Sequence, residues 1–575
     1  MNSNLIAPGQ CVSFTYKDLL LKKLYYSVLC SVFSQLVLLL LYLLVVNLDI
    51  IHPVTWLWSS VTTFLSLTTW LYVIPFITII FCQSIICARD YAFKSNYCST
   101  RFQKFIAVFS VHNLILLILH ILVGGLLVWM FLSLSDGDYK SFSTSCHKTH
   151  QCIVEGTFFL ILNGLFIGLY FFLKVYIAEK RLFFPVIHQR KWLQFKASVI
   201  PLCKESLVAA TLPTVYYLVF YFIWGNQLFI GLTNYLNLLP PESGEGYFLY
   251  IYAWLFGALY YFSMNLMRFF FNLFLTEPVE LPIIKQTDDS LTLQSSINNS
   301  NFPIIQSLAC LDLKLLAQWS PLRRQIFFML SQPGGHPHNW NILIENVLKL
   351  FTEYTELLNK STDTIRSDKQ PPPPPSQDPM SCLSPTQYDK FRNMRNMSMG
   401  YGSEVTDVVD VVNDTLPGQE AVTSIFSKLK DKIINFYNTL KVVLGINFIF
   451  GELPQANIQK CLANGHLIIQ TSEGISDLVC ASLVEDRYGI VQKDLPVLIT
   501  SMVELKQGLE KLNKIPALTR KMVGYDDFNY KMKGAVTAAV KRSLFNICRN
   551  FEKYLCEFPL SKDVLMQLQP FIVKN

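Results

Sequence analysis

Six apolar runs of about 20 residues dominate the first half of this 575-residue chain. A helix must be about 20 residues long to cross a hydrocarbon core of about 30 Å, so each run is long enough to span a bilayer. The spans are expected at residues 24–46, 64–86, 112–134, 153–172, 207–230 and 248–271. Only 15% of the residues are charged, against about 25% in soluble proteins. The sequence therefore predicts a six-helix transmembrane domain over residues 1–275.

The connections between the spans differ in positive charge. One set carries Lys17, Lys22, Lys23, Arg89, Lys94, Arg101, Lys104, Lys174, Lys180, Arg181, Arg190, Lys191, Lys196 and Lys204. The other set carries only Lys140 and Lys148. Because cytoplasmic loops retain positive charge, both termini are expected on the cytoplasmic side.

One pair of cysteines falls in a connection that this rule places in a lumen. Cys146 and Cys152 flank the loop, and an oxidising lumen favours a disulfide between them. His147 and His150 lie in the same loop and raise the alternative of a zinc site. The spacing matches no standard zinc pattern, so the disulfide is the preferred interpretation and no metal is expected.

The interiors of the spans contain no Asp, Glu or Lys, although such residues usually mark an ion or substrate path. His112 and His120 share one span without a carboxylate partner, which is typical of helix packing. Gly164 and Gly168 form a small-xxx-small pair that lets helices approach closely. The spans are therefore interpreted as an anchor, and an endomembrane channel or transporter is the alternative.

After the last span the composition changes three times. Residues 276–358 have helical periodicity, and residues 359–420 form a linker rich in Pro and Ser that includes five consecutive prolines. Such a linker cannot bury a core and is expected to be disordered. Residues 421–575 are again helical. The expected fold class is all-α, with six spans followed by a cytoplasmic helical region that the linker interrupts.

The C-terminal region is expected to begin with an amphipathic helix at about residues 422–444. Its apolar face comprises Val422, Ile425, Phe426, Leu429, Ile433, Phe436, Tyr437, Leu440 and Leu444. This face has two possible covers. It packs into the core of the domain, or it lies on a membrane surface with its lysines at anionic headgroups.

No known catalytic motif is present: the chain has no P-loop, no G-x-S-x-G and no H-E-x-x-H. His336 and His338 lie in a loop rich in Pro and Gly, which raises the hypothesis of a membrane-bound transferase. The preferred interpretation is a rigid turn in which His338 or Asn339 caps the following helix. Neither a catalytic residue nor a cofactor is expected.

Three groups of residues are specific enough to compare with known protein families. The first match runs from Leu311 to Gln325 and continues at residues 331–340. It includes Ser320, Pro321, Arg323, Arg324, Gln332, Pro333, Gly334, Gly335, His336, Pro337, His338, Asn339 and Trp340. The second includes Glu485, Asp486, Arg487 and Gly489, and the third is the Leu48–Pro53 string with Trp56. Together these three groups resemble the animal transmembrane nucleoporins of the nuclear-division-cycle-one family. The linker departs from that family because it is shorter than in vertebrate relatives.

This resemblance implies a structural protein of the nuclear pore membrane. Its expected role is to tether scaffold nucleoporins to the membrane and to support pore assembly. The expected partners are the lipid bilayer, the WD-repeat nucleoporin aladin and the membrane-binding, RRM-containing nucleoporin of the inner ring. No direct contact with nucleic acid is expected.

Overall fold

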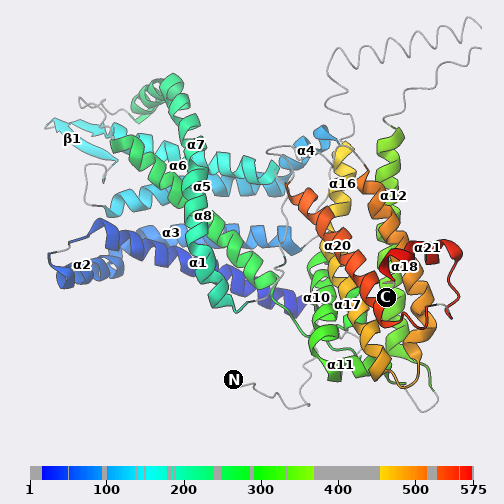
Figure 1. The fold of residues 1–575 in the computed structure, drawn as a ribbon. Coiled ribbons are helices and arrows are strands. Elements are labelled where there is room, and N and C mark those ends of the chain that lie inside the picture. The colour runs from blue at the N-terminus through cyan, green and yellow to red at the C-terminus, as the bar shows by residue number, and fades with distance from the viewer. Residues whose placement is uncertain are drawn as a thin grey trace, which may run out of the picture.

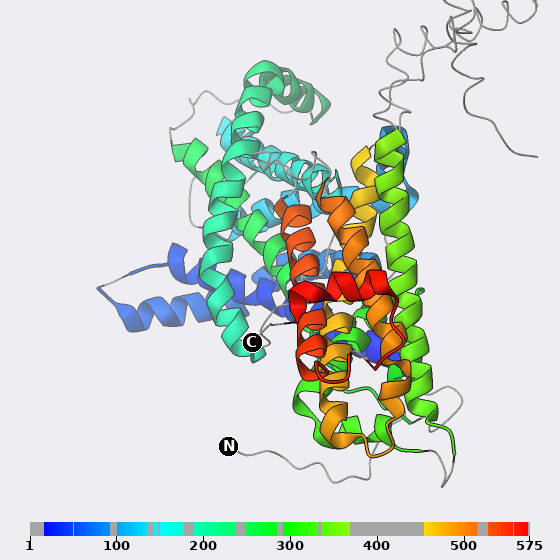
Figure 2. The same cartoon turned by 45° about the vertical axis from the view of Figure 1, so that its right-hand side comes forward.

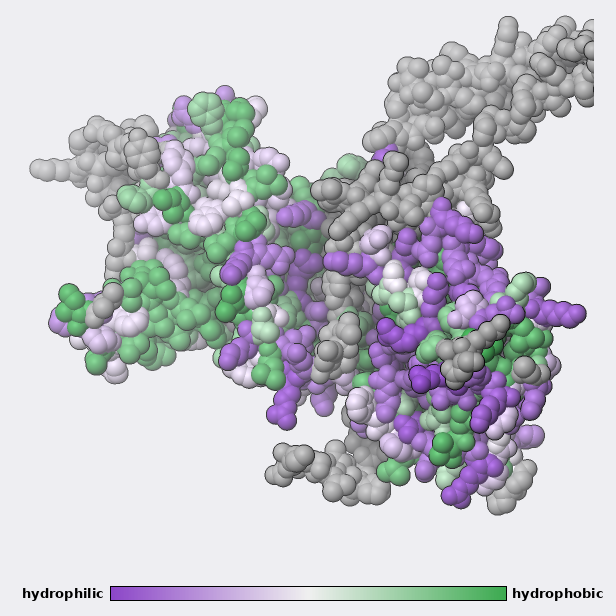
Figure 3. All heavy atoms as spheres, viewed as in Figure 1, coloured by the Kyte–Doolittle hydropathy of each residue, from purple (hydrophilic) through white to green (hydrophobic). Residues whose placement is uncertain are grey.

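The computed structural model describes residues 16–49, 51–92, 100–135, 140, 142–147, 150–177, 184, 189–236, 248–284, 291–330, 335–367, 454–514, 527–555 and 557–572. These residues form a bundle of long apolar helices and a separate helical domain, which lie side by side (Figure 1). The bundle surface is largely apolar, whereas the surface of the helical domain is largely polar (Figure 3). The two parts are therefore built for different solvents.

Six helices form the membrane bundle. They are α1 (Tyr16–Val46), α3 (Leu67–Ala92), α5 (Val111–Leu134), α6 (Glu155–Ile177), α7 (Lys191–Leu236) and α8 (Phe248–Leu275). Each contains one of the expected spans, apart from a few residues at the start of the second and fourth. Many large apolar side chains point outward, including Phe222, which is 90% exposed. An exposed apolar surface of this kind is suited to lipid.

Two features hold the bundle together. Gly124 of α5 lies against Gly164 and Gly168 of α6, so closely that an added Cβ atom would collide with the facing backbone. At the centre, Nδ1 of His120 lies 2.9 Å from Nε2 of Gln83 and 2.9 Å from the hydroxyl of Tyr260. These polar groups pair with one another between α3, α5 and α8, as an apolar surrounding requires.

By length and composition, six described helices are able to span a membrane: α1, α3, α5, α6, α7 and α17 (Gly465–Glu485). We assign α17 to the helical domain, because it packs between two other helices there. We assign α8 to the bundle, because it packs against α1, α6 and α7. Its several tyrosines lower its hydropathy without removing it from the apolar interior. The expected fold class, with six spans followed by helical segments, is confirmed.

The side of the bundle that faces away from the helical domain carries two small elements (Figure 1). Helix α2 (Pro53–Leu65) joins α1 to α3, and its Trp56 donates from Nε1 to the carbonyl of Leu44 at 2.8 Å. Strands β1 (Ser143–His147) and β2 (His150–Ile153) form an antiparallel hairpin between α5 and α6. Neither α2 nor the hairpin was predicted as an element.

The other side carries α4 (Arg101–Val108) and the helical domain. The domain consists of α9 (Leu293–Ile297), α10 (Pro303–Trp319), α11 (Pro321–Gln325), η1 (Ile326–Phe328), α12 (His338–Ser367), α16 (Pro454–Ala463), α17, α18 (Ile490–Asn513), α20 (Asp527–Asn550), α21 (Lys562–Leu568) and η2 (Gln569–Phe571). Helix α17 lies between α10 and α20, and α12 packs on α18. Figure 2 shows α12 running along the length of the domain. Segments from both sides of the linker thus share one core.

The expected amphipathic helix at residues 422–444 and most of the expected linker lie outside the described residues. Helix α12 continues beyond Leu358 to Ser367, past the residue at which the linker was expected to begin.

Candidate functional site at the membrane junction

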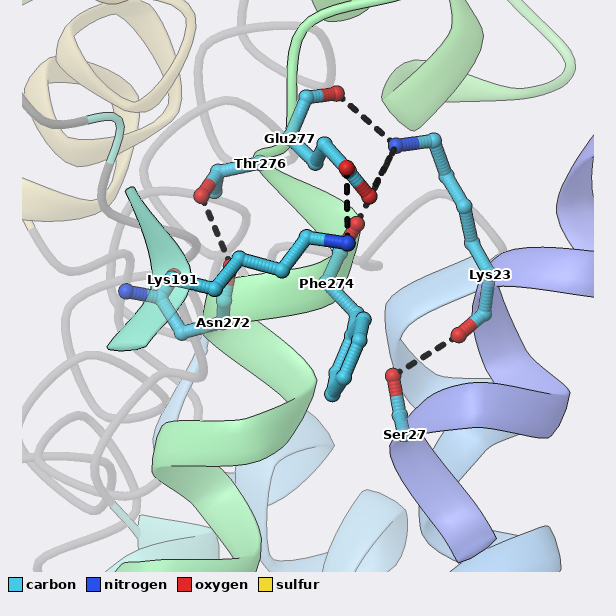
Figure 4. Close-up of polar contacts among 7 residues, drawn as sticks. All are labelled: Lys23, Ser27, Lys191, Asn272, Phe274, Thr276 and Glu277. Carbon is cyan, nitrogen blue, oxygen red and sulfur yellow. Dashed lines mark hydrogen bonds and ion pairs between the residues drawn. The ribbon is translucent and has the colours of Figure 1, made fainter. Parts of the chain in front are cut away.

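The chain leaves the bundle at a cluster of charged groups formed by three helices (Figure 4). Lys23 of α1 is only 5% exposed, and its Nζ donates to the carbonyl oxygens of Phe274, at 3.1 Å, and Glu277, at 2.8 Å. These carbonyls lie at the end of α8, where backbone oxygens lack partners within the helix and the helix dipole is negative. Lys23 therefore fixes the end of α8 to α1.

The side chain of Glu277 completes the cluster. Its Oε1 lies 2.7 Å from Nζ of Lys191 in α7, and its Oε2 lies 3.9 Å from Nζ of Lys23. The Lys191 ammonium also lies 4.9 Å from the centre of the Phe274 ring. One carboxylate thus joins the first turn of α7, the basic end of α1 and the exit from α8 (Figure 4).

Four residues after Glu277, the chain is held by the helical domain. The Leu281 N–H donates to Oδ2 of Asp312 at 2.9 Å, and Nη2 of Arg323 donates to the Leu281 carbonyl at 2.7 Å. Asp312 and Arg323 bind each other through two N–H···O bonds of 2.8 Å. Both belong to the first family-like match, so this match forms a clamp on the connection from the membrane.

The clamp is largely dry. The Asp312 side chain is 3% exposed and that of Arg323 is 20% exposed. Burial raises the pKa of the Asp312 carboxyl because it penalises the charged form, and the bonds from Arg323 oppose that rise. The carboxylate therefore depends on its arginine partner.

A second ion pair joins the first family-like match to the second. Arg324 donates from Nη2 and Nε to the carboxylate of Glu485, at 2.6 and 3.1 Å, and from Nη1 to the Ala317 carbonyl at 2.7 Å. Hydrogen bonds to Glu485 raise the pKa of Arg324, so the guanidinium stays charged. The pair ties α11 to the end of α17.

The residues after Glu485 shape the turn into α18. Asp486 accepts hydrogen bonds from the N–H groups of Tyr488, at 3.1 Å, and Val491, at 2.9 Å. Gly489 has φ of 64°, a conformation that favours glycine because it has no Cβ atom. Arg487 is exposed. This match is therefore a turn in which one aspartate and one glycine set the backbone.

Helices α10 and α17 run parallel, joined by a ladder of polar contacts. Ser307 Oγ lies 2.8 Å from His466 Nε2, Lys314 Nζ lies 2.7 Å from Glu473 Oε2, and Gln318 Nε2 donates to Asp477 Oδ2 at 2.9 Å. Gly474 lets the two backbones approach between these rungs. The ladder fixes the register of two helices from opposite sides of the linker.

His466 also contacts the connection between α6 and α7. Its ring stacks on Phe184, which lies between α6 and α7, with ring centres 5.0 Å apart. Burial lowers the pKa of His466 to about 4, so the imidazole is neutral at neutral pH. The helical domain thus contacts a connection of the transmembrane part at this ring pair, in addition to the contacts at the chain exit.

The loop with the two histidines is arranged as part of a helix start. His338 is the first residue of α12, and His336 and His338 are exposed, while Gly335, Pro337 and Asn339 are partly buried. Trp340 is buried and donates from Nε1 to Asp494 in α18 at 2.9 Å. Residues 331–334 lie outside the described ones. Among the residues that the structure describes, no group of three His, Cys, Asp or Glu is placed to hold a metal ion.

The structure also places the other predicted residues. Ser320 and Pro321 begin α11, and the backbone positions Cys146 in β1 and Cys152 in β2. The disulfide between these cysteines stays a prediction. Sequence reasoning missed Glu277 as a junction residue and used Lys23 and Lys191 only for topology. Glu277 is the first acidic residue after the last span, and Lys23 directly precedes the first span; this pairing of charges is the signal that points to the cluster.

Comparison with known proteins identifies the same family as the motifs do. The sequence model described as "Nucleoporin protein Ndc1-Nup" matches residues 20–569. Nucleoporin Ndc1 of Drosophila melanogaster is 26% identical over 97% of this chain and 98% of its own length. Nucleoporin NDC1 of Mus musculus is 24% identical over 98% of this chain and 99% of its own, and the Homo sapiens protein is 25% identical over 92% of both. This chain therefore belongs to the Ndc1-Nup family of nucleoporins and is a structural, non-enzymatic component of the nuclear pore.

Proposed function

We propose that this chain anchors the nuclear pore complex to the pore membrane and tethers scaffold nucleoporins through its helical domain. The observation that supports it best is the junction described above. Lys23, Glu277 and Leu281 connect the spans to the domain by buried or ion-paired contacts within a few residues of the bilayer exit. A load applied to the domain therefore reaches the spans through fixed contacts and not through a flexible tether.

In this proposal both termini and the helical domain lie on the pore side of the membrane. The uneven positive charge of the connections supports that orientation. The resemblance implies aladin and the RRM-containing inner-ring nucleoporin as partners, and the tethered position also supports a role in pore assembly.

One end of the helical domain offers a surface for such partners. Trp319 is 77% exposed, Leu322 is 81% exposed and Val484 is 90% exposed, where α10 and α17 end. Large apolar side chains left in water at one end of a domain are typical of a protein contact. The Arg324–Glu485 pair holds the two helix ends together, so this surface is preformed.

Proximity labelling from the C-terminus of the full chain in cells tests this function. We expect other nucleoporins among the labelled neighbours of the wild-type chain. The double variant Trp319→Asp with Leu322→Asp should keep its position in the nuclear envelope and lose some of those neighbours. Met566→Asp is the control, because Met566 is 63% exposed on α21, away from this surface.

Neighbours without nucleoporins would contradict the anchoring function. An unchanged neighbour list for the double variant would place the partner surface elsewhere and leave the anchoring function standing. Ion or solute flux through proteoliposomes containing the purified chain would support the channel or transporter alternative instead.

A further inference from the structure

The short helix α4 presents an apolar face to its surroundings. Phe105 is 61% exposed, Ile106 is 53% exposed and Phe109, directly after the helix, is 59% exposed. Together with Phe102 they follow the spacing i, i+3, i+4 and i+7, which places all four side chains on one face. Gln103 and Ala107 lie on the opposite face. The helix is therefore amphipathic over its whole length.

Local contacts fix α4 as a formed helix. The Thr100 hydroxyl accepts from the N–H of Gln103 at 3.1 Å, and Nδ2 of Asn113 donates to the Ala107 carbonyl at 2.6 Å. The rings of Phe105 and Phe109 lie 4.7 Å apart. Both ends of the helix are thus capped, which holds Phe105, Ile106 and Phe109 on one side of a formed helix.

The position of α4 limits what its apolar face meets. It lies at the end of the bundle near the helical domain (Figure 1), and α5 begins at Val111 directly after it. Only Phe109 and Ser110 lie between Val108 and Val111, so the end of α4 stays within about 10 Å of the start of a membrane span. On α5, Val111 and Ile118 are 76% and 50% exposed on the lipid-facing surface. The face of α4 is thus continuous in sequence with a lipid-facing strip.

We propose that α4 lies in the headgroup region of the bilayer leaflet on the helical-domain side, with Phe105, Ile106 and Phe109 among the upper parts of the acyl chains. Exposed Arg101, in the first turn, then sits at the level of lipid phosphates. The occupant of the apolar face is lipid, because the face joins the span surface at the membrane boundary. The proposal rests on the spans and not on the pore function.

Photo-crosslinking in the full chain tests this placement. A p-benzoylphenylalanine residue replaces Phe105, a change that keeps an aromatic ring at an exposed position. The matched control places the same residue at Gln103, on the opposite face, and the positive control places it at Ile115 of α5, which is 44% exposed in the span. Each purified chain is reconstituted in phospholipid nanodiscs, illuminated and analysed by intact mass and gel mobility.

We expect a mass increase of one phospholipid at positions 105 and 115 and none above background at 103. Crosslinks from position 105 to this chain's own polypeptide, or no lipid adduct there while position 115 gives one, would overturn the proposal. In the first case a protein segment covers the face. Equal lipid adducts at 103 and 105 would overturn it as well, because the helix would then have no oriented face.

Discussion

The Asp312–Arg323 pair shows how much can depend on two side chains in the family-like match. Both are buried enough to lose most of their hydration, and their two mutual hydrogen bonds replace it. Removing one partner of a buried pair leaves the other charge without compensation. The segment that follows α8 would lose an anchor at the same time, because Arg323 also binds the Leu281 carbonyl.

Arg323→Ala is therefore expected to lower the free energy of unfolding of the helical domain by about 3–5 kcal/mol. Hydrogen exchange on α10 peptides of the purified full chain in detergent measures the change. Arg487→Ala is the matched control, because Arg487 belongs to the second match but is exposed, and it should change the free energy by less than about 0.5 kcal/mol. Equal effects of Arg323→Ala and Arg487→Ala would show that the Asp312–Arg323 pair does not hold the segment that follows α8.

Contacts between residues that are distant in sequence could not be predicted. The strings around Arg324 and Glu485 each resemble the family, but neither string predicts that the two side chains bind each other across 161 positions. In the sequence, Lys23 serves only to predict the orientation of the spans, since a lysine before a span is ordinarily solvated at the headgroups. The burial of Lys23 follows from the packing of the end of α8 against α1, and the sequence does not reveal that packing.

At the scale of elements, the parallel pair α10 and α17 depends on one close approach. A Cβ atom added at Gly474 would lie 2.9 Å from the backbone nitrogen of Lys314 and 3.0 Å from its Cα atom. Backbone cannot yield as a flexible side chain does. The polar rungs on both sides of Gly474 require the two helices to stay in register, so the strain is not relieved by sliding.

Gly474→Ala is therefore expected to destabilise the domain by about 1–3 kcal/mol, the range for overpacking. Gly534→Ala in α20 is the control, because a Cβ there meets nothing within 4 Å. That change should stabilise the domain by about 0.5–1 kcal/mol, since alanine favours the helix. Thermal melting followed by circular dichroism compares them, and a melting temperature for Gly474→Ala at or above wild type would refute the close approach.

The sequence predicted the spans well because the bilayer imposes a minimum apolar length. It predicted their ends less well. Helix α7 runs from Lys191 to Leu236, far beyond the expected residues 207–230, because polar residues such as Lys196 end an apolar run without ending a helix. No helix was predicted between the first two spans, although Pro53 is well suited to the first turn of α2.

At the scale of the whole molecule, the hairpin and the helical domain lie at opposite ends of the bundle (Figure 1). The β1–β2 pairing places Cys146 and Cys152 on adjacent strands. If the helical domain faces the pore side, the hairpin faces the lumen of the nuclear envelope. The topology and the disulfide can therefore be tested together.

In selectively permeabilised cells with intact endoplasmic reticulum, a membrane-impermeant thiol reagent is expected to miss Cys146 and Cys152. After complete permeabilisation both should react only when a reductant is added first. A cysteine introduced as Met566→Cys, on the exposed surface of α21, serves as the positive control and should react at once. Labelling of the hairpin cysteines before the lumen is opened would reverse the proposed topology.

The parallel ladder also has a consequence for synthesis. Ser307 and Gln318 each contact a partner 159 residues later, and α17 then needs α20 on its other side. Contacts so distant in sequence form late, after the ribosome has released nearly the whole chain. A message with a premature stop before α20 would direct the synthesis of a protein that inserts its spans normally. Without α20, one apolar side of α17 would stay open to chaperones and degradation, so such truncations should remove the protein and not merely shorten it.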